Sequence, residues 1–264
     1  MLNKLAPIGV MDSGLGGLSV VVALQKVLPQ EDIIYFGDTA NCPYGNKSRD
    51  ELLRLSGNML QFLQEQGVKC VALACNTTSV LADDLRADYS VPIITVAESA
   101  ADAIAKMGLS NVGLIATVST VEGGIYPNRI SAVCPDCKVH AIGSVNLARL
   151  VEKGKRDEIE CEIRSCMDAL LKENSVDKVI LGCTHYPLVL DLFKQCYPNI
   201  EFIDPAPYQA ICVREELLRK DMVADRMTPK MTVFTTGDVE GFRSECESLG
   251  LNRAYEIAYN HIDA

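Results

Sequence analysis

The chain of 264 residues carries a formal net charge of −10, with 48% hydrophobic and 23% charged residues. This composition is that of a soluble globular protein with substantial cores, and the negative charge opposes nonspecific binding to nucleic acid. No apolar segment reaches the length of a membrane span, and no secretory signal is visible. We therefore expect a cytoplasmic protein with neither a membrane nor a nucleic-acid partner, and with its eleven cysteines reduced.

Short apolar runs alternate along the chain with helix-length segments of period three to four. The runs predict strands at Ile8–Met11, Ile33–Phe36, Val71–Ala74, Ile93–Val96, Val112–Ala116, Val179–Leu181, Phe202–Ile203 and Val233–Thr236. The periodic segments predict helices at about 17–28, 48–66, 78–88, 98–107, 146–153, 157–173, 187–196 and 207–220. This alternation indicates an α/β fold with parallel sheets, whose chemistry lies in loops at the carboxyl ends of the strands.

One design occurs twice, 108 positions apart. When residues 68–77 are laid over residues 176–185, Cys75 falls on Cys183, each at the end of a predicted buried strand. An amphipathic helical pattern precedes both strands. The repeat favours two domains.

The first domain is expected to combine residues 1–97 with 207–264 and to carry Cys75. The second is expected to span residues 98–206 and to carry Cys183. A duplicated fold of this kind can bring one thiol to each side of a single cleft. That arrangement suits the removal of a proton from one face of a carbon atom and its return to the other face.

The residues next to both cysteines favour a catalytic role for these thiols over a structural role in packing. Amide and hydroxyl side chains follow Cys75 where a helix begins, and such donors lower the pKa of a thiol. Cys183 has the same setting, and His185, two residues later, is a candidate proton-relay partner.

Two turns and a cysteine pair leave alternatives open. The glycine-rich loop from Asp12 to Ser19 suits a structural turn or a carboxylate-binding loop, with Asp12 holding a cation or orienting a proton-transfer residue. The loop 37–45 suits a rigid turn. Cys134 and Cys137 have redox or zinc spacing but lack a second ligand pair. We interpret the other cysteines, including Cys42, as packing residues.

Four motifs spread over nearly the whole chain are specific when taken together. They are Asp12-Ser13-Gly14 with Gly16-Gly17-Leu18-Ser19, Gly37-Asp38-Thr39 with Pro43-Tyr44-Gly45, Ala74-Cys75-Asn76-Thr77, and Gly182-Cys183-Thr184-His185-Tyr186-Pro187. Jointly they resemble the cofactor-independent aspartate/glutamate racemase superfamily, and within it the glutamate racemases. The resemblance implies two flavodoxin-like parallel-sheet domains related by pseudo-twofold symmetry, with the active site between them.

The resemblance also implies roles for individual residues. Cys75 and Cys183 match the two acid/base thiols, Asp12 and His185 match residues that assist them, and Glu152 matches an acid near the second thiol. The substrate-binding positions that it implies are Ser13, Pro43, Tyr44, Gly45, Asn76, Thr77, Thr117, Thr120 and Thr184. A homodimer is also implied.

We therefore expect an amino-acid racemase that interconverts L- and D-glutamate and supplies D-glutamate for peptidoglycan. No motif indicates a pyridoxal-binding lysine or a metal site, so we expect neither a cofactor nor a metal. One alternative is an aspartate or broad-specificity racemase of the same superfamily. A non-catalytic small-anion binding protein would leave the thiol pair unused, and a cysteine hydrolase built on Cys183 and His185 would leave Cys75 unexplained.

Overall fold

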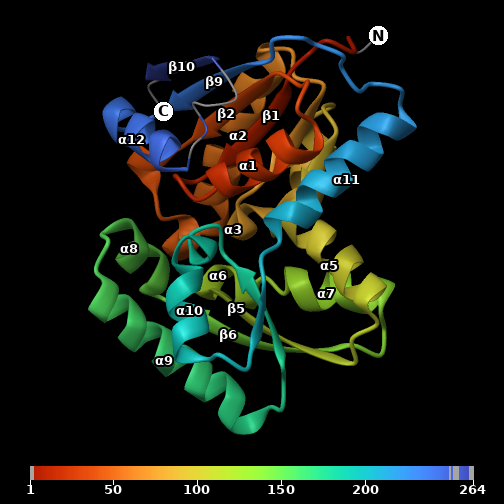
Figure 1. Ribbon diagram of the computed structural model, residues 1–264. Helices are drawn as coiled ribbons and strands as arrows, with labels where there is room; N and C mark the ends of the chain where they lie inside the picture. Colours follow the sequence, from red (N-terminus) through yellow and green to blue (C-terminus); the bar gives the residue numbers. More distant parts are fainter. Residues whose placement is uncertain (1–2, 250, 252–255, 262–264) are drawn as a thin grey trace.

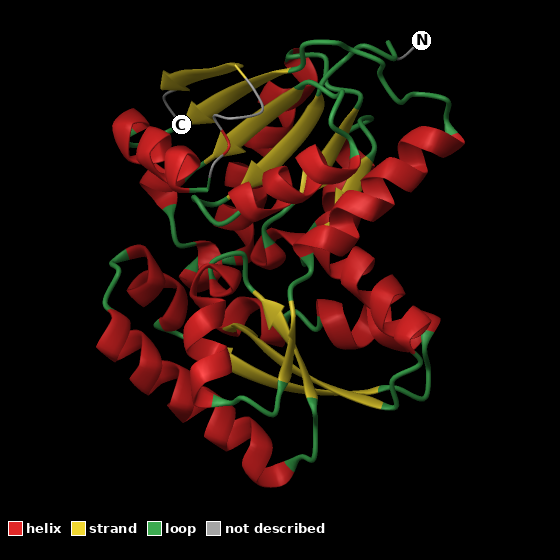
Figure 2. Cartoon of the chain, viewed as in Figure 1, coloured by secondary structure: helices red, strands yellow, loops and turns green. Residues whose placement is uncertain are grey.

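The computed structural model describes residues 3–249, 251 and 256–261, and arranges their strands in two sheets connected by helices (Figures 1 and 2). The strands are β1 (Ile8–Asp12), β2 (Ile33–Gly37), β3 (Cys70–Leu73), β4 (Ile93–Thr95), β5 (Asn111–Thr117), β6 (Lys138–Ser144), β7 (Lys178–Gly182), β8 (Glu201–Ile203), β9 (Lys230–Thr235) and β10 (Glu256–His261). The α-helices are α1 (Leu18–Val27), α2 (Arg49–Glu65), α3 (Asn76–Ser79), α4 (Ala82–Asp88), α5 (Val96–Met107), α6 (Val118–Glu122), α7 (Ile125–Val133), α8 (Leu147–Glu152), α9 (Arg156–Glu173), α10 (Leu190–Cys196), α11 (Ala206–Arg219) and α12 (Val239–Ser248). Short 3-10 helices are η1 (Thr39–Asn41), η2 (Tyr44–Asn46) and η3 (Tyr186–Val189).

The two sheets repeat one strand order. Sheet A has the order β10-β9-β2-β1-β3-β4, and sheet B has the order β6-β5-β7-β8. Every pairing among the described strands is parallel. In chain order, β1 to β4 correspond to β5 to β8, so β3 and β7, which precede the two cysteines, occupy equivalent places. The predicted α/β class with two parallel sheets is confirmed.

Helices cover both faces of each sheet, because successive strand residues point to opposite sides. In β5, Leu114 packs in a core with α5 and α7, whereas Ile115 packs in a separate core with α8, α9 and α10. In β3, Ala72 packs beneath α1 and α11, whereas Leu73 packs beneath α2 and α4. Strands buried on both faces explain the near-continuous apolar runs in the sequence.

The chain crosses between the sheets twice. After β4 it continues through α5 into sheet B, and after β8 it returns through α11 to sheet A, where β9 pairs with β2. Helices α5 and α11 pack against each other at this crossing (Figure 1).

Several elements have no counterpart among the sequence predictions. They are β6, β10, α6, α7 and α12. Strands β6 and β10 form the edges of their sheets, and most β6 side chains are partly or fully exposed, so β6 lacks an apolar run. Cys134 and Cys137 lie in the turn between α7 and β6, where the Cys137 N–H donates to the Cys134 carbonyl, and both are free thiols.

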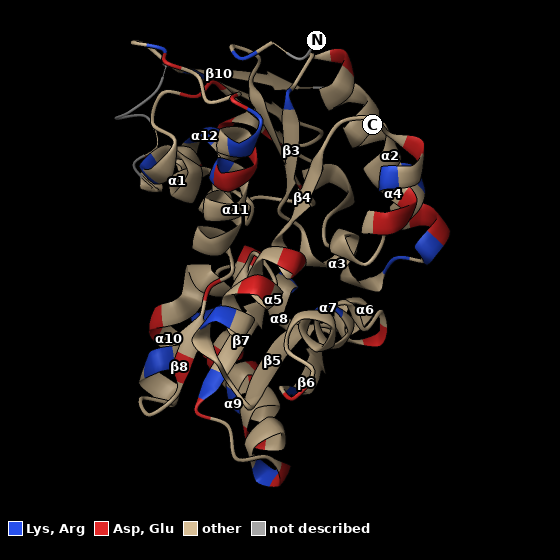
Figure 3. Ribbon diagram, turned by 90° about the vertical axis from the view of Figure 1, so that its right-hand side faces the viewer, with Lys and Arg blue, Asp and Glu red and all other residues tan. Residues whose placement is uncertain are grey.

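Charged residues of both signs are interspersed over both halves of the molecule in the view of Figure 3. None of the helices in the described part of the chain has the length and apolar character needed to cross a membrane.

A buried ion pair lies at the amino-terminal ends of the strands of sheet A. Lys69 Nζ lies 2.5 Å from Glu31 Oε2, and the two side chains are 0% and 1% exposed. The ammonium group also donates to the carbonyls of Lys4 and Met222, and Glu31 Oε1 accepts the Ala224 N–H. The pair therefore joins the start of the chain to the segment between α11 and β9.

Removing the lysine should destabilise the protein strongly. Lys69→Met keeps the aliphatic volume but removes the Lys69 ammonium group from this buried pair, and removing one partner of a buried ion pair typically costs about 3–5 kcal/mol. The matched control is Lys178→Met, because the Lys178–Glu201 pair is partly exposed, and surface pairs contribute about 0–1 kcal/mol. Urea unfolding of both variants measures the difference. Equal losses of stability would contradict this account of the pair.

Candidate active site

A small cavity lies where the carboxyl ends of strands from sheet A and sheet B face each other. Its lining residues are Ser13, Pro43, Tyr44, Gly45, Cys75, Asn76, Thr77, Thr117, Ala148, Cys183, Thr184 and His185. Three further predicted residues, Asp12, Thr120 and Glu152, lie behind this lining and are hydrogen-bonded to it. The fold thus brings together every predicted site residue, and both predicted thiols line one cavity.

Asp12 ends β1 and folds its carboxylate back onto the glycine-rich loop. Its Oδ2 accepts the N–H groups of Gly14 at 3.1 Å and Gly17 at 3.0 Å. A side chain at Gly17 would meet Asp12 Cβ at 2.5 Å, so the contact requires glycine there. The Gly14 and Gly17 amides of this loop therefore bind the protein's own carboxylate.

The burial of Asp12 raises the pKa of its carboxyl, although the charge of His185 and the loop N–H groups oppose this shift. Asp12 also reaches across the cavity, because Thr184 Oγ1 donates to Asp12 Oδ1 at 3.2 Å. A carboxylate with a raised pKa accepts a proton from a thiol more readily than an exposed one does.

Cys75 follows β3 and stands at the start of α3, with its Sγ 3.7 Å from Ser13 Oγ. We expected a lowered thiol pKa here, and that expectation is wrong. Burial, followed by the negative charge of Asp12, raises the pKa of Cys75 to about 11, because the opposing hydrogen bonds from Thr78 and Ser13 are the weaker influence. In this arrangement Cys75 is a protonated thiol at neutral pH and is suited to donate a proton.

Cys183 follows β7 and begins a line of three polar groups. Its Sγ lies 3.7 Å from His185 Nδ1, and His185 Nε2 lies 3.0 Å from Glu152 Oε1 at the end of α8. Burial lowers the pKa of His185, but the hydrogen bonds to Cys183, Cys42 and Glu152 outweigh burial and raise it well above the usual value. Burial raises the pKa of Glu152, but the contacts with His185 and Cys42 outweigh it, so the pKa is lowered. A protonated imidazole therefore faces the Cys183 sulfur.

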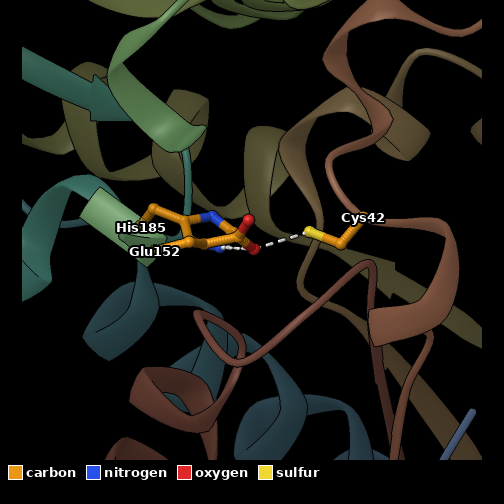
Figure 4. Close-up of side chains that lie close together, drawn as sticks. All are labelled: Cys42, Glu152 and His185. Atoms are coloured by element: carbon orange, nitrogen blue, oxygen red, sulfur yellow. Dashed lines mark hydrogen bonds and ion pairs between the residues drawn. The ribbon is translucent and has the colours of Figure 1, made fainter. Parts of the chain in front are cut away.

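Cys42 belongs to the site, although we expected it only to fill space. Its Sγ lies 2.8 Å from Glu152 Oε1, and the thiol, the carboxylate and the imidazole of His185 point toward one another (Figure 4). Burial raises the pKa of Cys42 to about 12, so its thiol is a donor to the carboxylate. Among the residues that the structure describes, these three alone form a cluster whose atoms could hold a metal ion.

Hydroxyl groups from both halves form a third part of the lining. Thr77 Oγ1 lies 3.0 Å from Thr117 Oγ1, which lies 2.8 Å from Thr120 Oγ1. Asn76 Oδ1 accepts a hydrogen bond from Tyr126 of α7, a residue that the sequence patterns did not single out. These contacts fix the donors and acceptors that follow Cys75 against the carboxyl end of β5.

Tyr44 lines the cavity, and its hydroxyl is hydrogen-bonded to Asp38. The hydroxyl donates to Asp38 Oδ2 at 2.5 Å, and Asp38 Oδ1 also accepts the Thr236 hydroxyl. The neighbouring Gly45 carbonyl accepts the Ser119 hydroxyl from α6. This turn is therefore held from both sides of the cavity, and the Tyr44 hydroxyl is already committed to Asp38.

The cavity is nearly closed in this arrangement. Its volume of about 10 Å³ is roughly that of one water-sized probe. The Thr184–Asp12 and Ser119–Gly45 hydrogen bonds join the two halves across it.

A family profile described as Asp/Glu/Hydantoin racemase matches residues 8–210. The chain belongs to this racemase family. A glutamate racemase from Thermoanaerobacter sp. (strain X514) is 37% identical over 248 residues, which are 93% of each chain. The resemblance expected from the four motifs is confirmed.

Solved racemase structures share the whole fold. The glutamate racemase isoform RacE1 from Bacillus anthracis superposes with a TM-score of 0.91 at 32% identity, covering 99% of this chain and 98% of that one. The glutamate racemase from Francisella tularensis, solved in complex with D-glutamate, gives a TM-score of 0.89 at 29% identity, with 98% of both chains covered.

In this member of the Asp/Glu/Hydantoin racemase family, two thiols with different partners line one cavity. Cys75 is buried next to a carboxylate, whereas Cys183 faces an imidazolium that is itself held by a carboxylate. Such a site can start the reaction with one sulfur as the base and the other as the acid.

Proposed function

We propose that the protein interconverts L- and D-glutamate by proton transfer at Cα between Cys75 and Cys183. The observation that carries this proposal is the presence of both thiols in the lining of one small cavity, at the ends of equivalent strands β3 and β7. A one-base enzyme has no use for the second thiol. The glutamate racemases that resemble the chain along nearly its whole length support glutamate as the substrate.

In one direction, the Cys183 sulfur removes the α-proton as a thiolate and becomes a thiol. The carbanion then takes the Cys75 proton on its opposite face, and Cys75 becomes a thiolate. To restore the starting state, Cys183 gives its proton to His185 Nδ1 as Nε2 releases one to Glu152 and solvent, and Cys75, beside Asp12, takes a proton from solvent. The reverse direction exchanges the two roles.

The α-carbon of an amino acid is weakly acidic, so the charge that develops on the substrate must be stabilised. We assign this task to donors in the lining, with Ser13 and Asn76 on one side of the cavity and Thr184, once its hydroxyl leaves Asp12, on the other. Thr77, Thr117 and Thr120 complete the substrate pocket as a hydroxyl cluster. Pro43, Tyr44 and Gly45 form its wall.

We assign residues 1–97 and 207–264 to the first domain and residues 98–206 to the second, so that the thiols come from different domains. We further infer that the protein acts as a homodimer in the cytoplasm and supplies D-glutamate for peptidoglycan. Family resemblance supports the homodimer and the cell-wall role, and the free state of the cysteines suits a reducing compartment.

The test is turnover of L-glutamate in deuterated water without added cofactor. The circular dichroism signal of L-glutamate should decay to zero. Nuclear magnetic resonance should show deuterium at Cα of the product, because the protons of both thiols exchange with solvent deuterium. L-aspartate in a parallel assay separates a glutamate racemase from an aspartate racemase. Product that retains its original α-hydrogen would rule out the two-thiol mechanism, and net hydrolysis would indicate a cysteine hydrolase.

A further inference from the structure

We propose that Cys42, Glu152 and His185 form a zinc-binding site, and that zinc bound there reversibly inhibits the enzyme. The three side chains come from separate parts of the fold: the loop after β2, the end of α8, and the turn after β7 (Figure 4). The binding of zinc is independent of the proposed function. The inhibition rests on the proposed racemase activity.

The three ligand atoms converge on one place. Cys42 Sγ, a Glu152 carboxylate oxygen and a His185 ring nitrogen all lie within 4.8 Å of one another. A Cβ atom added to Gly14 would lie 2.9 Å from Cys42 Sγ, 3.3 Å from Glu152 Oε1 and 3.4 Å from His185 Nε2. Glycine at residue 14 therefore keeps a side chain from pressing against these three ligand atoms.

The chemistry of the ligands selects the ion. A thiolate, an imidazole and a carboxylate are the ligands that zinc uses, and three protein ligands with one open position are typical of catalytic zinc sites. Magnesium and calcium prefer oxygen ligands, so the thiol and imidazole disfavour them.

The geometry needs little adjustment to accept the ion. Tetrahedral zinc with bonds of about 2.0–2.3 Å separates its ligand atoms by about 3.5 Å. The Cys42–Glu152 and Glu152–His185 contacts are 2.8 Å and 3.0 Å. Each contact must therefore open by less than about 1 Å, which side-chain rotation can supply.

Zinc at this position would stop proton transfer at Cys183. His185 Nδ1 faces the Cys183 sulfur at 3.7 Å, so the other ring nitrogen is the one directed at the ion. Zinc on Nε2 would displace the proton that His185 holds there against Glu152, so the imidazole could no longer pass a proton between Cys183 and Glu152. The ion would also join Cys42, on the sheet A side, to Glu152 and His185, on the sheet B side, and so oppose opening of the cavity.

Cobalt(II) tests the site directly, because a cobalt–thiolate bond gives a charge-transfer absorption in the near ultraviolet. Chelator-treated protein should bind one cobalt ion per chain with this absorption, and zinc should displace it. Cys42→Ser retains a hydrogen-bond donor to Glu152 but removes the sulfur ligand. The matched control is Cys161→Ser, which removes an exposed thiol on α9.

We expect Cys42→Ser to lose the charge-transfer band and to raise the zinc concentration for half-inhibition by at least about 10–100-fold, the cost of even an outer-shell change at a metal site. Cys161→Ser should match the parent protein in both measurements. Glu152→Gln should weaken cobalt binding as well, and provides the test if Cys42→Ser does not fold.

A band that persists in Cys42→Ser, or zinc inhibition that is equal in the parent and this variant, would overturn the proposal and place the ion on Cys75, Cys183 or another thiol. The absence of cobalt binding in the parent would also overturn it. If the parent binds cobalt through Cys42 but does not racemise glutamate, the metal site stands and the proposed function fails.

Discussion

Replacing Cys75 or Cys183 with serine is expected to lower the rate of glutamate racemisation by more than ~10³-fold. Racemisation needs a base on one face of Cα and an acid on the other, and both thiols line the cavity that would hold this carbon. A serine hydroxyl is a far weaker acid than a thiol, and is a poor base at neutral pH. Circular dichroism with L- and D-glutamate measures the loss.

Each serine variant should nevertheless still remove an α-proton with its remaining thiol. Elimination of chloride from a β-chlorinated glutamate analogue needs one base and a leaving group, and no acid on the opposite face. Cys75→Ser should therefore eliminate from the enantiomer whose α-hydrogen faces Cys183, and Cys183→Ser should eliminate from the other enantiomer. Chloride release from each pure enantiomer measures this preference.

The control for these variants is Cys161→Ser, whose thiol is exposed on α9. It should racemise glutamate at the parental rate, and far-ultraviolet circular dichroism should show that all three variants fold. If both active-site variants consumed the same enantiomer of the analogue, the two sulfurs would not flank the substrate and the two-thiol mechanism would fail.

Most of the fold follows from local sequence patterns. Strands buried on both faces, such as β1 and β7, give short apolar runs that any window of the sequence reveals. Edge strand β6 gives no such run, because its neighbours bury few of its side chains. Helix α7 is equally hard to recognise from its residues, since it carries Pro127 and little amphipathic pattern.

The candidate site also contains residues that local sequence patterns indicate and residues that they do not. The 108-residue repeat indicates both thiols because duplicated strands end at equivalent places. Cys42 gives no such signal, since its importance comes from Glu152, 110 positions away in the chain. The pKa of Cys75 could not be predicted either: the neighbouring donors are local in sequence, whereas the burial that outweighs them comes from the packing of the whole domain.

Asp12→Asn and His185→Asn should each slow racemisation by about 10²–10⁴-fold, the usual contribution of a general acid or base. Asp12 lies in the loop beside Cys75, and His185 lies 3.7 Å from the Cys183 sulfur. Each therefore should serve the proton transfers of one thiol. Asparagine retains an oxygen acceptor for the Gly14 and Gly17 N–H groups, so the loop should keep its shape.

An unequal effect on the two directions will not be visible in kcat/KM for glutamate in either variant. The equilibrium constant of a racemisation is one, so kcat/KM must remain equal in both directions whatever residue is changed. Asymmetry is confined to kcat and KM taken separately, which must shift together, and to reactions that use a single base. The β-chlorinated analogue is therefore the sharper probe.

With that analogue, Asp12→Asn should slow elimination from the enantiomer that Cys75 attacks by at least about tenfold more than from the other, and His185→Asn should show the opposite preference. The Thr184–Asp12 hydrogen bond crosses to the Cys183 side, so a smaller effect on the second enantiomer is expected for Asp12→Asn.

Asp136→Asn removes an exposed carboxylate in the turn before β6 and is the matched control, with parental rates for both enantiomers. Equal slowing of both enantiomers in both variants would mean that Asp12 and His185 act on the site as a whole, by shaping it or setting its charge. Unequal slowing in opposite senses would assign one proton-transfer partner to each thiol.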